Sequence, residues 1–285
     1  MGRPRSAGAE VGAVNAFPWA AFAANLAAAA GAALAVLLAT FAIALVKGIH
    51  RIVDSAWGLA FAAVAVTSCA VAAAGGHGDP GRRALVTALT VAWGLRLCLH
   101  IAWRGRGHGE DPRYERMLAK AGPGAARRAW YALRMVYLLQ AALVWLISLP
   151  VQAACYAPEP VGVLAVVAAL VWGAGVAFEA VGDWQLRAFK ADPANRGRIM
   201  DRGLWAWTRH PNYFGDFLVW WGLYLLACTG LAVAAATVVS PLTMTFLLTA
   251  GSGKALLERH MADRPGYAAY RARTSGFFPR PPRRV

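Results

Sequence analysis

Residues 25–45 read NLAAAAGAALAVLLATFAIAL, a run of small and apolar residues without a single charge. An apolar segment of about 18 or more residues is long enough to cross the hydrocarbon core of a bilayer as a helix. Small residues also allow neighbouring membrane helices to pack closely. The stretch therefore predicts a membrane-spanning helix with a scaffold role.

Apolar runs of this kind recur throughout the 285-residue chain. Hydrophobic residues make up 59% of the sequence and charged residues 15%, whereas soluble domains carry about 25% charged residues. We expect an all-α polytopic membrane protein with about seven transmembrane helices. They cover roughly residues 20–46, 54–74, 84–103, 130–156, 160–182, 213–230 and 232–257.

The expected domain organisation is simple. Residues 1–18 form a flexible N-terminus, residues 19–260 one transmembrane domain, and residues 261–285 a cytoplasmic C-terminal tail. The tail is expected to form a short helix and then a disordered stretch rich in Pro and Arg.

The net charge of +15 is distributed unevenly along the chain. With seven spans, one side holds only Arg3, Arg5, Arg82 and Arg83, and most other Lys and Arg residues fall on the opposite side. This asymmetry follows the positive-inside pattern, so we expect an outside N-terminus and cytoplasmic basic loops and C-terminus. Topology and contact with anionic membrane lipids explain the basic charge, so nucleic-acid binding is not needed to account for it. Part of the basic charge is also available to bind a phosphorylated ligand.

The four cysteines are scattered in or beside the apolar runs. They form no CxxC pair and have no histidine at metal-ligand spacing, so the sequence predicts no metal site.

Ionisable residues within the predicted spans lie at or toward the cytoplasmic ends. Such residues are costly in a membrane and usually functional, so their shared depth predicts a polar cavity that faces the cytoplasm. Several share a helix face at i, i+4 spacing. The ionisable residues are Asp54, Arg96, Arg134, Glu179, Asp183, Asp216, Lys254 and Glu258. His100 shares a face with Arg96, Arg187 with Glu179 and Asp183, Asn212 with Asp216, and Lys254 with Glu258.

Simpler interpretations exist for some of these residues. Arg134 and Lys254 can extend to the membrane interface, and Asp54 suits the positive end of a helix dipole. His100 is compatible with an interfacial position. Glu179 and Asp183 are harder to explain structurally, because two acids on one buried face repel unless a cation or donor lies between them.

The stretch GLWAWTRHPNYFGD (203–216) concentrates polar residues at the start of the sixth predicted span. Pro211 disfavours helix at His210 and suits a first helical turn, so the helix is expected to begin there. Its free N–H groups form an anion site, with Arg209 just outside it. Asn212 adds an amide and Tyr213 a hydroxyl and an aromatic face. Either a pyrophosphate or the carboxylate of a methyl donor suits such a site.

This stretch, continued as FLVWWGLYL and preceded by FEAVGDWQLRAFKADPANRG, resembles the C-terminal region of the steroid 5-alpha-reductase family, in its bacterial branch. SAWGLAF (55–61), WGLRL (93–97) and GEDPRY (109–114) resemble that branch too, and the similarity covers roughly residues 45–280. A looser resemblance to isoprenylcysteine and phospholipid methyltransferases rests on RHPNYFG and LLERHMADRPGYAAYRARTSGFFP.

The reductase resemblance implies a seven-helix bundle in a bacterial inner membrane, with NADPH in a cytoplasm-facing cavity. Hydride then passes to the β carbon of an enone. By position, Asp54 corresponds to a catalytic Glu, and Trp93, three residues before Arg96, to a third-helix Tyr. Trp cannot donate a hydroxyl proton, so the proton donor is left open. The implied cofactor-binding residues are Glu179, Asp183, Arg187, Lys190, Asn212, Asp216, Lys254 and Glu258.

The resulting hypothesis is a membrane-embedded reductase of an apolar, steroid-like or other lipid enone that enters from the bilayer. A buried, protonated Asp54 would polarise the substrate carbonyl. Arg209, His210 and Tyr213 complete the expected cofactor site. A methyltransferase that uses S-adenosylmethionine and a non-enzymatic lipid-binding protein remain alternatives, and the sequence leaves the oligomeric state open. Cofactor phosphates would pair with Arg106, Arg113, Arg187, Lys190, Arg196, Arg198 and Arg209.

Overall fold

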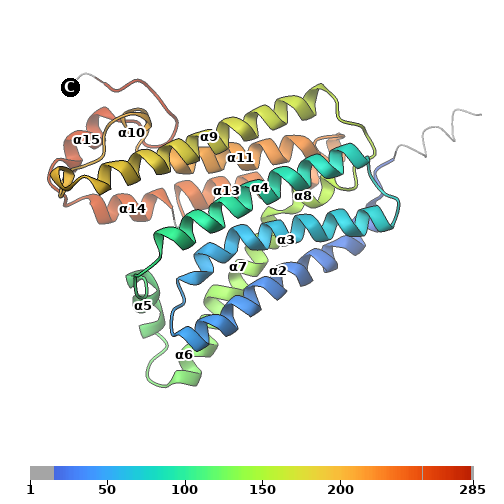
Figure 1. Cartoon of the computed structure of the whole chain (residues 1–285). Coiled ribbons are helices and arrows are strands. Elements are labelled where there is room, and N and C mark those ends of the chain that lie inside the picture. Colours follow the sequence, from blue (N-terminus) through green and yellow to red (C-terminus); the bar gives the residue numbers. More distant parts are fainter. Residues whose placement is uncertain (1–15, 252, 284–285) are drawn as a thin grey trace, which may run out of the picture. The chain divides into compact units, whose positions relative to one another are not determined.

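The computed structural model describes residues 16–251 and 253–283, which are mostly helical (Figure 1). The predicted flexible N-terminus falls largely outside these residues. The chain divides into a first unit, Met1–Ala165 with Leu226–Thr237, and a second unit, Val166–Leu225 with Val238–Val285. Both units contribute to the region 19–260 that the sequence predicts as one domain.

The first unit is a bundle of long helices with two short ones at one end. The π-helical turn η1 connects two α-helices without a break in the chain direction. The elements are α2 (Trp19–Lys47), α3 (Ile52–Ala74), α4 (Pro80–Arg104), α5 (Pro112–Ala119), α6 (Ala125–Ala132), η1 (Leu133–Leu138), α7 (Leu139–Ile147), α8 (Leu149–Ala154) and α12 (Leu231–Thr237).

The second unit contains most of α9, which begins in the first unit, and the C-terminal helices. Its elements are α9 (Val163–Ala191), the 3₁₀ turn η2 (Pro193–Asn195), α10 (Leu204–Trp207), α11 (Pro211–Ala227), α13 (Val239–Thr249), α14 (Lys254–Met261) and α15 (Tyr267–Arg273). α11 begins at Pro211, as the sequence predicts.

The fold class is confirmed, because six helical segments among the described residues are long and apolar enough to cross a membrane. α11, with 17 residues, corresponds to the remaining predicted span and lies at the lower limit of membrane-crossing length. The last predicted span, 232–257, lies within a segment that is divided into α12, α13 and α14. Outward-facing side chains such as Ile43 and Val46 are 49% and 89% exposed, as expected of a lipid-facing helix surface.

Glycines allow α3 and α4 to approach each other closely in the first unit. A Cβ at Gly58 or at Gly94 would overlap the backbone carbonyl of the other glycine. Membrane helices have little hydrophobic driving force for association, so close van der Waals packing at small residues carries much of the stability. The same device joins α9 and α11 in the second unit, where a Cβ on Gly215 would lie 2.5 Å from Gly175 O.

The C-terminal segment packs along the chain before α11. Thr208 and Ser275 form an isolated parallel β-bridge. Arg209 N donates to Ser275 O at 2.9 Å, and Arg280 N donates to Trp207 O at 3.0 Å. The short helix expected in the tail is α15. The expectation of a disordered Pro/Arg stretch is wrong up to residue 283, because backbone hydrogen bonds fix its course.

We predict that Gly94→Val lowers the free energy of unfolding by about 1–3 kcal/mol, because its side chain overpacks the α3–α4 contact. Gly31→Ala is the control, since nothing lies within 4 Å of an added Cβ at that helical position. Equilibrium unfolding in mixed micelles measures both variants. Equal stability of the two proteins would contradict the proposed close contact.

Candidate functional site

Asp54, in the first turn of α3, is the centre of a polar cluster in the first unit. The Tyr114 hydroxyl donates to Asp54 Oδ1 at 2.5 Å, and Arg113 Nη2 donates to Asp54 Oδ2 at 3.0 Å. Arg113 Nε also donates to Asp111 Oδ1 at 3.0 Å, so the guanidinium bridges two carboxylates. The Asp54 side chain is 28% exposed, which leaves the cluster open to small molecules at one edge.

Local sequence explains how Arg113 and Tyr114 are presented. Asp111 caps α5 by accepting from Arg113 N at 2.8 Å, and Pro112 occupies the first turn, where its missing N–H costs nothing. Glu110 then ties this loop to the start of α3. It accepts backbone hydrogen bonds from His50 and Arg51 at 2.5 and 2.9 Å.

The environment keeps the Tyr114 hydroxyl protonated. Burial raises the pKa of Tyr114 well above its usual value, and the adjacent Asp54 charge raises it further. The phenol is therefore a proton-bearing donor at neutral pH. Sequence reasoning quoted Tyr114 only within GEDPRY. The Asp-Pro pair signals a helix start at this point, but nothing local signals that Tyr114 reaches Asp54, 60 residues earlier.

The other predicted catalytic residues lie on α4. Trp93 is 1% exposed, and its ring centroid lies 5.7 Å from that of Phe61. Trp93 is thus a core side chain at the α3–α4 contact, which accounts for its presence without chemistry. Arg96 and His100 are half-buried on the same helix.

Glu258, on α14, organises a second cluster, which lies in the second unit. Arg209 donates to Glu258 Oε1 from Nε at 3.0 Å and from Nη2 at 2.8 Å. Arg209 Nη1 donates to the carbonyls of Thr274 and Arg271 at 2.5 and 3.2 Å. These bonds join the start of α11, α14 and the C-terminal segment. They also occupy the Arg209 guanidinium, which the sequence predicts as a phosphate ligand. These contacts favour a structural role for Arg209.

His210 contacts the same carboxylate oxygen as Arg209. Its Nε2 lies 3.2 Å from Glu258 Oε1, and its ring stacks on Tyr213 with centroids 5.4 Å apart. Because a carboxylate only accepts, Nε2 carries a hydrogen in this contact. Burial lowers the pKa of His210 to about 4, although Glu258 opposes the shift. At neutral pH the contact is therefore a hydrogen bond from a neutral imidazole.

The remaining predicted cofactor residues in this unit lie on neighbouring elements. Glu179 is 3% exposed and lies against Gly215 of α11. If Gly215 carried a Cβ, that atom would lie 2.7 Å from Glu179 Cγ. Asp183, Arg187 and Lys190 follow it along α9, and Asp216 follows Gly215 on α11. Asn212 Oδ1 accepts from Tyr213 N at 3.1 Å. Lys254 lies close to the Glu258 cluster, on the side of Gly276. If Gly276 carried a Cβ, that atom would lie 3.3 Å from Lys254 Nζ and 3.1 Å from Arg209 Nη2.

A basic cavity of about 270 Å³ lies in the C-terminal segment of the second unit. Thr274 lines it, and its Oγ1 is buried without a hydrogen-bond partner in the described part of the chain. A ligand with several phosphate oxygens would satisfy both the arginines and this hydroxyl. Sequence reasoning missed this cavity because it treated the Pro/Arg stretch after the short tail helix as disordered. The basic run RARTSGFFPRPPRR was the available signal. The arginines that line the cavity are Arg271, Arg273, Arg280 and Arg283.

The predicted residues are thus gathered into separate clusters. Asp54, Trp93 and Arg96 belong to the first unit, as do Arg106 and Arg113, which were predicted to pair with cofactor phosphates, and the other predicted cofactor residues belong to the second. The single cavity formed by four helices, and the cytoplasmic orientation of the basic loops, stay predictions.

A family described as "Protein of unknown function (DUF1295)" matches residues 40–274. The chain belongs to this family. The DUF1295 match includes the Asp54 cluster, the Glu258 cluster and α9, so both polar clusters lie within the family region. No curated protein and no solved structure matches the chain.

We predict that the neutral His210 makes stability depend on pH. Its folded pKa of about 4 lies below the ordinary value of 6.5, so between these values the unfolded chain binds more protons. The free energy of unfolding should therefore fall by about 1 kcal/mol per pH unit as the pH drops through this window. His210→Gln should remove this part of the slope, whereas His108→Gln, at an exposed position, should keep it. Parallel slopes for all three proteins in micelles would contradict the prediction.

Proposed function

We propose that this membrane protein is an NADPH-dependent reductase of the C=C bond of an apolar enone. The observation that carries the proposal is the hydrogen bond of 2.5 Å between the Tyr114 hydroxyl and Asp54. Reduction of an enone needs a hydride at the β carbon and a proton on the oxygen side. The α4 position that the resemblance assigns to a phenol holds Trp93, and Tyr114 provides a phenol from α5 instead.

The side chains around Tyr114 suit a proton donor. Asp54 accepts from the hydroxyl and holds it in one position, and Arg113 fixes the Asp54 carboxylate from its other oxygen. Tyr114 would turn its one hydroxyl hydrogen from Asp54 to the substrate oxygen and donate it there as negative charge develops. Arg113, next to the ring, would stabilise the phenolate that remains. Asp54 is partly exposed and would connect the phenol to water, from which the proton is restored.

This arrangement revises the role expected for Asp54. The sequence-based hypothesis has a protonated Asp54 polarising the substrate carbonyl directly. The contacts with Arg113 and Tyr114 use Asp54 as an acceptor, so we propose that it positions the phenol. The substrate is proposed to enter from the bilayer, which suits a chain with six membrane-crossing segments among its described residues.

The second unit offers side chains that fit the cofactor. NADPH, when bound, would supply the hydride for the reaction. Arg271, Arg280 and Arg283 of the C-terminal cavity and the unsatisfied Thr274 hydroxyl fit its phosphate groups, whereas Arg273 already pairs with Asp201. Arg187 and Lys190 at the end of α9 remain further proposed phosphate contacts. The acids and amide of the sequence prediction, Glu179, Asp183, Asn212 and Asp216, would take hydrogen bonds from the ribose and nicotinamide groups.

A methyltransferase that uses S-adenosylmethionine is the second candidate. One observation favours it: the two stretches on which that resemblance depends meet at Glu258. Arg209 and His210 of RHPNYFG both contact Glu258 of LLERH. This reaction would use a carboxylate-binding site at the start of α11 and would need no proton from Tyr114.

The cofactor identity separates the two candidates. We expect NADPH, and not S-adenosylmethionine, to raise the unfolding temperature of the detergent-purified full chain. Arg280→Gln with Arg283→Gln should weaken NADPH binding by about tenfold or more, because charge-assisted hydrogen bonds to phosphate are lost. Arg202→Gln with Arg264→Gln removes equal charge at exposed positions outside the cavity and is the control. Stabilisation by S-adenosylmethionine alone would overturn the reductase proposal, and stabilisation by neither compound would favour a lipid-binding protein.

The proton donor has its own test. In membranes supplied with NADPH and a panel of apolar enones, Tyr114→Phe should lower turnover by about 10²- to 10⁴-fold. NADPH binding should be unchanged, because the hydroxyl is proposed to act on the substrate. Tyr156→Phe removes another buried phenol of the first unit and should keep full turnover. Full turnover by Tyr114→Phe would refute the role of Tyr114 while leaving the cofactor proposal intact.

A further inference from the structure

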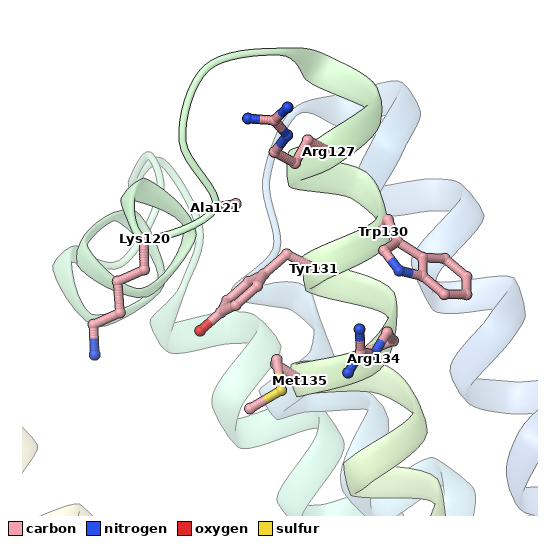
Figure 2. Close-up of a pocket in the computed structure, with 7 residues that line it drawn as sticks. All are labelled: Lys120, Ala121, Arg127, Trp130, Tyr131, Arg134 and Met135. Carbon is pink, nitrogen blue, oxygen red and sulfur yellow. The ribbon is translucent and has the colours of Figure 1, made fainter.

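A second basic cavity lies in the first unit, at the turn between α5 and α6 (Figure 2). Its volume is about 270 Å³. None of its described lining residues takes part in the Asp54 cluster, so the proposed reaction does not explain it. The lining residues are Lys120, Ala121, Arg127, Trp130, Tyr131, Arg134 and Met135.

Backbone geometry brings these side chains together. Gly122 and Gly124 have φ angles of 76° and 108°, which residues with a Cβ rarely adopt. The turn they form folds α6 back beside the end of α5 that carries Lys120. Arg127 Nη1 would lie 3.6 Å from a Cβ on Gly122, so the guanidinium lies beside the turn. Tyr131, one turn further along α6, projects toward the same end of α5 in Figure 2.

The cavity is cationic and partly aromatic. Lys120, Arg127 and Arg134 line it, and none of its described lining residues is acidic. Arg134 also lies over the Trp130 ring, with the guanidinium carbon 5.9 Å from the centroid. Arginine and lysine side chains favour a phosphate group, which accepts several charge-assisted hydrogen bonds.

The position of the cavity in the membrane segment indicates which phosphate compound it takes. It is built on the first turns of the membrane-crossing segment Ala125–Ile147. Trp130 is 59% exposed there, and an exposed Trp beside basic residues is typical of the headgroup level of a bilayer. Beyond the cations, Met135 and Leu139 are 44% and 50% exposed one helical turn apart. Met135 and Leu139 therefore form an apolar stripe that follows the basic residues along the helix.

This combination matches a phospholipid, whose phosphate is joined to acyl chains. We infer that the α5–α6 cavity is a binding site for the headgroup of an anionic phospholipid. Lys120, Arg127 and Arg134, which project from different sides of the cavity in Figure 2, attract the anionic headgroup, and the Met135–Leu139 stripe lies against the acyl chains. Free inorganic phosphate shares the headgroup chemistry but has nothing to place on the stripe. The site is independent of the proposed reduction.

Native mass spectrometry of the full-length protein tests the inference. The protein is released from micelles that contain phosphatidylglycerol or phosphatidylcholine at equal concentrations. We expect the wild-type protein to retain phosphatidylglycerol preferentially. Arg127→Gln with Arg134→Gln should weaken this retention by about thirtyfold, since each basic residue at an anionic membrane surface contributes about fivefold. Both side chains are exposed, so the fold should persist.

Two comparisons make the result specific. Arg104→Gln with Arg202→Gln removes the same charge at exposed positions outside the cavity and should retain phosphatidylglycerol like the wild type. Lys120→Gln alone should give an intermediate loss. The inference is overturned by equal losses in the two double variants, by equal retention of phosphatidylcholine, or by displacement of the lipid with millimolar inorganic phosphate. NADPH binding should not change in any of these variants.

Discussion

The cost of leaving a charge unpaired next to a membrane is the constraint on which both polar clusters depend. Asp54 and Glu258 each lie near the end of a helix, and each accepts from an arginine and from an aromatic side chain. Charge-assisted hydrogen bonds offset the desolvation of the carboxylates. The same bonds join the helix ends to the loops that carry these partners. Each carboxylate therefore acts first as an anchor for its loop, and any chemistry uses side chains that the anchor has already positioned.

Local sequence rules predict the helices better than the contacts between them. Apolar runs predict the membrane spans, and Pro211 predicts the start of α11, because both signals are local in the sequence. The Asp111-Pro112 pair gives the start of α5 by the same logic. The break between α12 and α13 falls within apolar sequence and is less visible, whereas the break between α13 and α14 falls at the glycine-rich stretch AGSG (250–253).

The candidate site shows where sequence reasoning stops. Asp54 and Glu258 were predicted from their depth in the spans, but their partners were not, because Arg113, Tyr114 and Arg209 lie tens of residues away. The resemblance, and not depth, suggested a site role for Trp93, whose ring packs against Phe61. The C-terminal arginines were missed because a Pro/Arg composition resembles disorder, while the hydrogen bonds to Trp207 and Arg209 that order them are long-range.

The ionisation states of the two clusters limit how a single reaction can use them. His210 has a pKa of about 4, so at neutral pH it carries no ionisable proton to give. Arg209 is committed to Glu258 and to two backbone carbonyls. The Glu258 cluster is therefore a poor source of protons and a poor receiver of new phosphate contacts. The Tyr114 phenol retains its proton, and the tail arginines line an open cavity. Under the proposed function, the proton donor therefore lies in the first unit and the phosphate-binding arginines lie in the second.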